Sequence, residues 1–187
     1  MLKTLFMSNR FSDLGINSEI QQSLSALQIS VPTDIQEKVI PVILSQTEDV
    51  VALAKTGTGK TAAFGLPLIQ LIDTTKDAIQ AIVLAPTREL GQQIHSNLES
   101  FAVNSPEISI AVICGGIPIK PQIERLKKTT HIVVATPGRL ADLVKRDAIN
   151  IKDISHFILD EADEMVSALK EGLDSIIKEI PKKRRTL

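Results

Sequence analysis

Aromatic side chains are scarce in this 187-residue sequence. It contains no Trp and no Tyr, and only five Phe. Proteins that hold single-stranded nucleic acid mainly by base stacking need several such rings on one surface, so the composition excludes that mode of binding. The sequence also has a single cysteine, Cys114, which excludes an internal disulfide and argues against a structural zinc site.

An excess of charge and long apolar runs are also absent. The 21 Lys and Arg are balanced by 22 Asp and Glu, so the net charge does not indicate a nucleic-acid binder. No apolar run is long enough to span a bilayer, and the N-terminal apolar stretch is too short for a signal peptide. We therefore expect a cytoplasmic protein without membrane contacts, whose length suits one domain over residues 1–187.

What the sequence does contain is a series of short runs rich in β-branched residues. They are almost continuously apolar, as in strands that are buried on both faces. Helical periodicity lies between them, for example in residues 90–101. This alternation predicts an α/β fold with a mostly parallel central sheet and helices on both faces. The expected strands are 50–53, 81–85, 108–114, 131–136 and 156–160.

The remaining segments give weaker predictions. Residues 12–45 should be helical, and residues 161–180 should form another helical stretch. Pro67 lies inside the helix expected at 60–72, so we predict a kink or an early break there. The basic run 182–185, KKRR, is interpreted as a solvated turn that leads into a strand, with a nucleic-acid patch or a nuclear signal as the alternative.

A phosphate-binding loop follows the first expected strand. Residues 54–61, AKTGTGKT, have the P-loop pattern, except that Ala54 replaces the usual first Gly. Backbone N–H groups and the N-terminus of the next helix would surround a phosphate. Lys60 would reach the β- and γ-phosphates of ATP, and the Thr61 hydroxyl would ligate Mg²⁺. The alternative is a Gly/Thr-rich turn with an incidental Lys. The loop residues expected to bind the nucleotide are Lys55, Thr56, Gly57, Thr58, Gly59, Lys60 and Thr61.

An acidic cluster follows the last of the expected strands. The stretch HFILDEADEM at 156–165 passes directly from apolar residues to Asp160 and Glu161. Parallel strands end at the same edge of a sheet, so Asp160 can converge with Lys60 and act as the acid on the Mg²⁺ side. Glu161 can then serve as the general base for the attacking water. Helix capping by acidic residues is the alternative.

Taken together, the motifs resemble the DEAD-box RNA helicases. Seven of them occur in family order and cover nearly the whole chain: Phe11, PTDIQ at 32–36, AKTGTGKT at 54–61, PTREL at 86–90, Gly115-Gly116, TPGR at 136–139 and DEAD at 160–163. The resemblance implies a RecA-like P-loop NTPase domain, with a helical Q-motif region at 11–45 and a P-loop core at 46–187. It implies an ATP-dependent RNA helicase, which is an ATP hydrolase. One departure is Gln28-Ile29, where the family often has Gly and an aromatic residue.

The resemblance also assigns roles to single residues. Gln36 would read adenine, since its amide offers the donor and acceptor that match the N6 and N7 edge, and Phe11 would stack on that base. Asp163 would contact the Ser-Ala-Thr motif expected just after Leu187. The segments expected to bind RNA carry small residues, hydroxyls and two Arg, which suits phosphates and sugars rather than base edges. They comprise Pro86, Thr87, Arg88, Gly115, Gly116, Thr136, Pro137, Gly138 and Arg139.

Two alternatives to an RNA helicase remain open from the sequence. One is a DNA helicase of the same superfamily, which need not carry Phe11 with Gln36 or PTREL with TPGR. The other is an ATP-dependent RNA clamp or scaffold. In each case the resemblance implies a second RecA-like domain that is absent from this sequence, and we expect the chain itself to be monomeric.

The 187-residue chain alone should bind adenine nucleotide weakly and barely hydrolyse ATP. Lys60, Thr61 and Glu161 would supply positioning, metal binding and a base, but no cation over the γ-phosphate. Where an arginine finger from another domain operates, it is worth about 10³–10⁵ in rate. Measuring the release of phosphate from ATP, with and without RNA, tests this prediction of weak hydrolysis. RNA-stimulated turnover comparable to that of a two-domain helicase would contradict the prediction.

Overall fold

The central sheet is entirely parallel. The computed structural model describes residues 10–55 and 57–187, and five strands pair in the order β2-β3-β1-β4-β5. The α/β prediction is therefore confirmed, and four of the five expected strands are present. The strands are β1 (Ala81–Leu84), β2 (Ile110–Ile113), β3 (Ile132–Ala135), β4 (His156–Leu159) and β5 (Arg185–Thr186).

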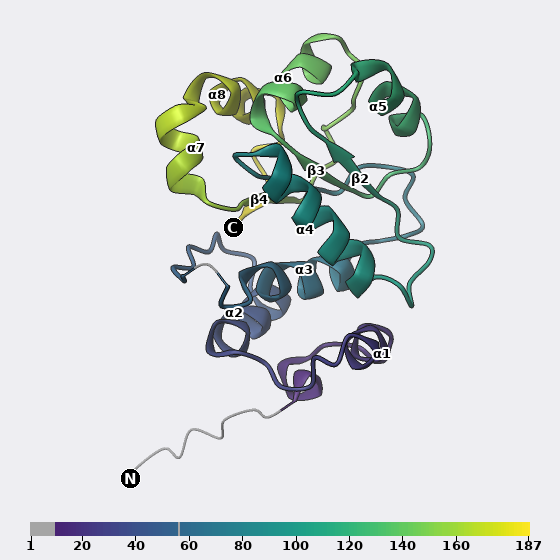
Figure 1. Ribbon diagram of the computed structural model, residues 1–187, viewed down its shortest axis with the longest axis vertical. Coiled ribbons are helices and arrows are strands. Elements are labelled where there is room, and N and C mark those ends of the chain that lie inside the picture. The colour runs from purple at the N-terminus through teal and green to yellow at the C-terminus, as the bar shows by residue number, and fades with distance from the viewer. Residues whose placement is uncertain (1–9, 56) are drawn as a thin grey trace.

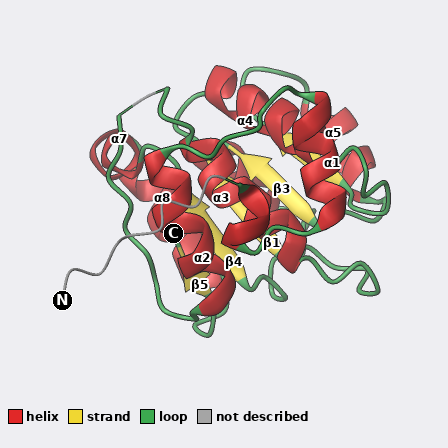
Figure 2. Ribbon diagram, turned by 90° about the horizontal axis from the view of Figure 1, so that it is seen from below, coloured by secondary structure: helices red, strands yellow, loops and turns green. Residues whose placement is uncertain are grey.

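Helices cover both faces of the sheet (Figures 1 and 2). Alternate residues of β1 point to opposite sides: Ala81 and Val83 join one core cluster, and Ile82 and Leu84 join the other. This is why the strands read as continuously apolar. The first cluster packs under η1 (Phe11–Leu14), α1 (Ser18–Ala26), α2 (Asp34–Ser45), α3 (Lys60–Leu71) and α4 (Arg88–Phe101). The second packs under α5 (Ile119–Leu126), α6 (Pro137–Lys145), α7 (Ala162–Ala168) and α8 (Lys170–Glu179).

The register of the sheet aligns the strand ends. Leu84 at the end of β1 is opposite Ala135 of β3 and Leu159 of β4, and Ala135 is in turn opposite Ile113 of β2. The residues that follow these four positions therefore meet at the carboxyl edge of the sheet, which is where parallel α/β folds bind ligands. No helix within the described ranges is long and apolar enough to cross a bilayer.

The strand predicted at 50–53 is not formed. Val51 is 89% exposed and Leu53 is 91% exposed. The neighbouring strand β5 has two residues, and the bond from Val50 N to Thr186 O is 3.0 Å. A β-rich sequence needs a ladder of hydrogen bonds to become a strand, and β5 is too short to provide one here.

One helix prediction also needs correction, and a second gains detail. Helix α3 continues through Pro67 to Leu71, so an early break is wrong. Every residue from Ala62 to Ile69 is buried, and this packing outweighs the backbone hydrogen bond that Pro67 cannot donate. The closing stretch 161–180 forms two helices, α7 and α8, which are separated at Leu169.

The basic run 182–185 is only partly a solvated turn. Lys182 and Lys183 are exposed, but the side chain of Arg184 lies over the Phe157 ring at 5.8 Å. Arg185 is 5% exposed. Its guanidinium donates to the backbone oxygens of Glu48, Ile43 and Val42 at 2.8, 2.6 and 3.1 Å. Arg185 therefore satisfies carbonyl groups at and just beyond the C-terminus of α2, where helical partners are missing.

Replacing Arg185 with Met should lower the free energy of unfolding by about 2–4 kcal/mol, because several buried carbonyls lose a charged donor. Urea denaturation monitored by circular dichroism measures this. Lys183→Met is the matched control, and a change within about 0.5 kcal/mol is expected for this exposed position. Equal stability of the two variants would show that the buried guanidinium does not hold α2 in place.

Candidate functional site

The phosphate loop turns sharply into α3. Gly57 and Gly59 have φ values of 79° and 91°, the left-handed region that favours glycine. The Thr58 hydroxyl donates to the carbonyl of Lys55 at 2.7 Å, which tightens the turn. Gly59 is the N-cap of α3, and Lys60 and Thr61 are its first residues. The N–H groups that start this helix therefore belong to the loop, while Thr56 lies outside the described residues.

The start of α2 holds this loop. The Thr33 hydroxyl donates to the Thr58 carbonyl at 2.9 Å. The Gln36 amide donates to the Gly59 carbonyl at 3.1 Å, and its oxygen accepts from Thr33 N at 2.9 Å. A Cβ on Gly59 would collide with the Gln36 Nε2 atom. Gln36 is thus buried and its amide bonds to the protein backbone at both ends, so the reading of adenine remains a prediction.

A cavity of about 580 Å³ opens beside this junction. Part of its lining comes from the loop and part from the first turn of α2. Lys38 is a lining residue that the sequence analysis missed, although it is two positions after Gln36. The lining residues are Thr33, Asp34, Ile35, Lys38, Leu53, Ala54, Lys55 and Thr58.

Phe11 does not line this cavity. Its side chain is buried in the core cluster that η1, α1 and α2 share with the sheet. This placement gives Phe11 a clear packing role at the start of the helical region. Stacking on adenine stays a prediction for this residue.

The acidic cluster starts at the end of β4. Asp160 is buried, and its N–H donates to the Leu84 carbonyl at 3.0 Å. Burial raises the pKa of Asp160, although the positive charge of Lys60 opposes the rise. Burial also raises the pKa of Glu161, with added repulsion from Glu164 and Asp160. The charge of Lys60 acts on both carboxylates, so the N-terminus of α3 and the end of β4 lie together.

Glu161 has an unusual backbone conformation. Its φ of 56° and ψ of 50° lie in the left-handed region, and it is the N-cap of α7. Such a conformation is uncommon for a residue with a Cβ and is frequent at functional sites. Asp163, in the first turn of α7, is exposed. The two carboxylates therefore differ in surroundings, since Glu161 is half-buried beside Lys60 and Asp163 faces solvent.

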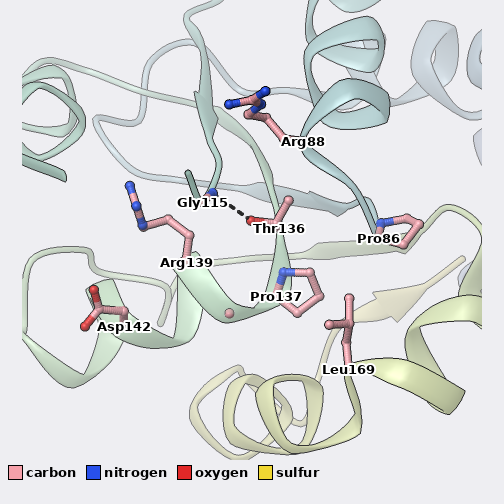
Figure 3. A pocket seen from close by; sticks show the side chains of 9 residues that line it. Pro86, Arg88, Gly115, Thr136, Pro137, Arg139, Asp142 and Leu169 are labelled. Atoms are coloured by element: carbon pink, nitrogen blue, oxygen red, sulfur yellow. Dashed lines mark hydrogen bonds between the residues drawn. The ribbon is translucent and has the colours of Figure 1, made fainter. Parts of the chain in front are cut away.

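A second cavity, of about 440 Å³, lies along the same sheet edge (Figure 3). We call it the cradle. Most of the residues predicted to bind RNA line it, and they come from the ends of β1, β2 and β3. Asp142 and Leu169 also line it and were missed by the sequence analysis. The lining residues are Pro86, Arg88, Gly115, Thr136, Pro137, Gly138, Arg139, Asp142 and Leu169.

Hydrogen bonds hold the cradle in shape. Gly115 N donates to the Thr136 hydroxyl at 3.1 Å, which joins the ends of β2 and β3 (Figure 3). Arg139 donates from Nη2 to the Ile117 carbonyl at 2.9 Å. Its Nη1 atom is buried and has no hydrogen-bond partner among the described residues. A buried donor without a partner is costly, and a ligand oxygen could satisfy this one only if the Arg139 side chain moved to expose it.

Three other residues border this network. Arg88 pairs with Glu89 at 3.0 Å. Thr87, which does not line the cradle, caps α4 by accepting from Leu90 N at 3.2 Å. Gly116 has a φ of 77°, and a Cβ there would lie 3.4 Å from a nitrogen of Arg88. The structure therefore brings both predicted Arg residues to one region.

A magnesium ion would have few protein ligands here. Among the described residues, no group of three or more His, Cys, Asp or Glu side chains could hold a metal ion. Mg²⁺ often binds through one or two carboxylates together with water and substrate phosphates. The buried carboxylate of Asp160 and the hydroxyl of Thr61 fit that kind of shared site.

The family follows from comparison with known proteins. Residues 33–187 match the family model described as DEAD/DEAH box helicase. The chain belongs to this family. It is 43% identical to the DEAD-box ATP-dependent RNA helicase CshA of Streptococcus pneumoniae over 95% of this chain and 34% of that protein. It is 42% identical to the ATP-dependent RNA helicase CshA of Limosilactobacillus reuteri over 95% of this chain and 36% of that protein.

Solved structures of the family have the same fold. A DEAD box protein from Methanococcus jannaschii superimposes with a TM-score of 0.87 at 40% identity, covering 95% of this chain and 48% of that one. Dbp5 of Saccharomyces cerevisiae, bound to RNA and ADP BeF3, has a TM-score of 0.87 at 28% identity, covering 96% and 45%. This DEAD/DEAH box chain spans about a third of the length of the curated relatives it matches.

Asp160→Asn should stabilise the protein at pH 7 but not at pH 4. The pKa of Asp160 is raised in the folded state, mainly by burial. The stability it contributes is therefore present below the ordinary carboxyl pKa and is lost as the pH rises through the raised value. Urea denaturation at both pH values measures the difference.

Asp153→Asn, at an exposed turn, is the control and should change stability by less than about 0.5 kcal/mol at either pH. A less stable Asp160→Asn protein at pH 7 would show that the ionised carboxylate is favoured by its surroundings.

Proposed function

We propose that this chain is the ATP- and RNA-binding first domain of an ATP-dependent RNA helicase, in which ATP binding and hydrolysis drive local unwinding of RNA duplexes. One observation carries the proposal: the phosphate loop, the acidic end of β4 and the cradle share the carboxyl edge of one sheet. The names of the CshA relatives and the RNA and ADP BeF3 bound to Dbp5 support it.

At the nucleotide site, the loop between Gly57 and Lys60 would bind the phosphates of ATP through backbone N–H groups and the Lys60 ammonium. Thr61 and Asp160 would hold Mg²⁺, which neutralises phosphate charge when it is bound. Glu161 would accept a proton from the attacking water. Its raised pKa suits that role, because a base works best when its pKa is nearer the working pH.

Adenine recognition would fall to Gln36 and Phe11. The Gln36 amide presents the required donor and acceptor, but both now bond to backbone atoms. Reading adenine would therefore exchange at least one of these bonds for a bond to the base. That exchange would couple the arrival of the base to the loop, because one of the two bonds is made to Gly59.

At the cradle, Arg88, Arg139 and nearby backbone groups would hold the phosphates and sugars of RNA without reading sequence. A chain with a net charge of −1 would thus bind RNA through a local positive field. A second RecA-like domain would contact Asp163 and supply the cation that the γ-phosphate lacks here. We place the protein in the cytoplasm and expect this chain to be monomeric.

Two other functions predict different behaviour. A DNA helicase would bind DNA at least as well as RNA of the same sequence. An ATP-dependent clamp would stay bound to RNA without separating a duplex. The relatives named as RNA helicases favour the first proposal.

Glu161→Gln, in a protein that carries this chain with a second RecA-like domain, should lower RNA-stimulated ATP turnover by about 10²–10⁴ because the general base is lost. ATP binding should remain within about twofold, since the amide keeps the size of the side chain. Glu179→Gln, at an exposed position of α8, is the matched control and should retain turnover.

The same assay, with a short labelled duplex, separates the alternatives. Strand separation that requires ATP and is competed by RNA but not by DNA would support the helicase. Turnover of Glu161→Gln within a few-fold of the wild type would refute the base assignment. Stable RNA binding without strand separation would favour the clamp.

A further inference from the structure

The cradle has two walls of different chemistry. Arg88 and Arg139, together with the carboxylate of Asp142, supply one, and Pro86, Pro137 and Leu169 supply the other. Figure 3 shows Leu169 on the side of Pro137 that faces away from both Arg side chains. A phosphate would be attracted to the first wall, and the less polar faces of a ribose or base would fit the second.

Leu169 lies at the junction between α7 and α8. Its backbone, with φ −126° and ψ 22°, is not helical. Its N–H donates to Met165 O at 2.9 Å, and its carbonyl accepts from Leu173 N at 3.1 Å. Met165 and Leu173 are both buried in the core. The backbone of the junction is therefore held from both sides, and the half-buried Leu169 side chain lines the cradle.

Gly172 brings this junction close to the RNA-binding segments. A Cβ built on Gly172 would lie 3.4 Å from the carbonyl carbon of Pro137 and 3.5 Å from Gly138 N. The first turn of α8 thus packs directly against the first turn of α6. This close packing fixes the distance of Leu169 from Pro137.

We propose that Leu169 contacts bound RNA, packing against the ribose or base of a nucleotide whose phosphate is held by Arg139. The inference rests on the proposed function, since it takes RNA as the occupant. The two guanidinium groups of the opposite wall outnumber the single carboxylate of Asp142, and this excess of positive charge favours a phosphodiester. None of the lining residues is aromatic, so an aliphatic side chain takes the place that a stacking ring has in other RNA-binding proteins.

Helix α7 connects the proposed RNA contact to the proposed catalytic base. Helix α7 starts directly after Glu161 and ends one residue before Leu169. The proposed base and the proposed RNA contact therefore lie at the two ends of one short helix. RNA held against Leu169 would restrain the helix whose N-cap carries the Glu161 carboxylate.

The test compares Leu169→Ala with Val166→Ala in the 187-residue chain. Val166 is an exposed apolar residue of α7, three positions before Leu169, and does not line the cradle. An NMR titration with a single-stranded oligouridine RNA measures the affinity. Leu169→Ala should weaken binding by about 3- to 10-fold, as expected for the loss of a half-buried leucine contact, and Leu169→Met should restore most of it. Val166→Ala should match the wild type.

The salt dependence separates a contact from a structural effect. An apolar contact releases no counterions, so the loss for Leu169→Ala should be the same at about 50 and about 200 mM salt. Arg139→Gln should instead reduce the salt dependence itself. A Leu169→Ala protein with a reduced salt dependence would show that the change displaced the Arg residues, which would overturn the proposed contact.

Two further outcomes are decisive. If the wild type binds RNA and Leu169→Ala binds as tightly as Val166→Ala, the inference is wrong and the proposed function stands. If the wild type does not bind RNA at millimolar concentrations, the proposed function fails and the inference fails with it.

Discussion

The parallel register of β1, β3 and β4 is the constraint on which the rest of the structure depends. Because the three strands run in the same direction and end at the same level, the residues after each strand meet at one edge. The segments beginning at Pro86, Thr136 and Asp160 are far apart in the sequence, yet they follow aligned neighbouring strands. The antiparallel pairing of any one of these strands would move its segment to the opposite edge.

The central part of this arrangement could be predicted from the sequence. Strands buried on both faces must be continuously apolar, and this property identified β1, β2, β3 and β4. The strand at 50–53 has the same composition but failed to form, because strand formation also requires a partner, and β5 is only two residues long. The sequence of residues 50–53 contains no information on the length of the strand that would pair with them.

The site was predicted unevenly for a similar reason. Compact motifs pointed to Lys60 and Asp160, and the resemblance to the DEAD-box family pointed to Arg139. Leu169 and Arg185 were not, because their roles come from packing between segments distant in the sequence. Leu169 reaches the cradle only because Gly172 allows α8 to approach α6. Arg185 resembles the exposed lysines before it in the sequence, yet its guanidinium is buried at the end of α2.

The left-handed backbone of Glu161 has a consequence for how this site is maintained. Glycine would adopt that conformation with less strain, so a glycine at position 161 would make the folded protein more stable. A glutamate held there, half-buried among other carboxylates, is a local loss of stability that the surrounding sheet and helices must offset. Drift toward a more stable protein would therefore tend to remove this carboxylate, and only selection for what the carboxylate does would keep it in place.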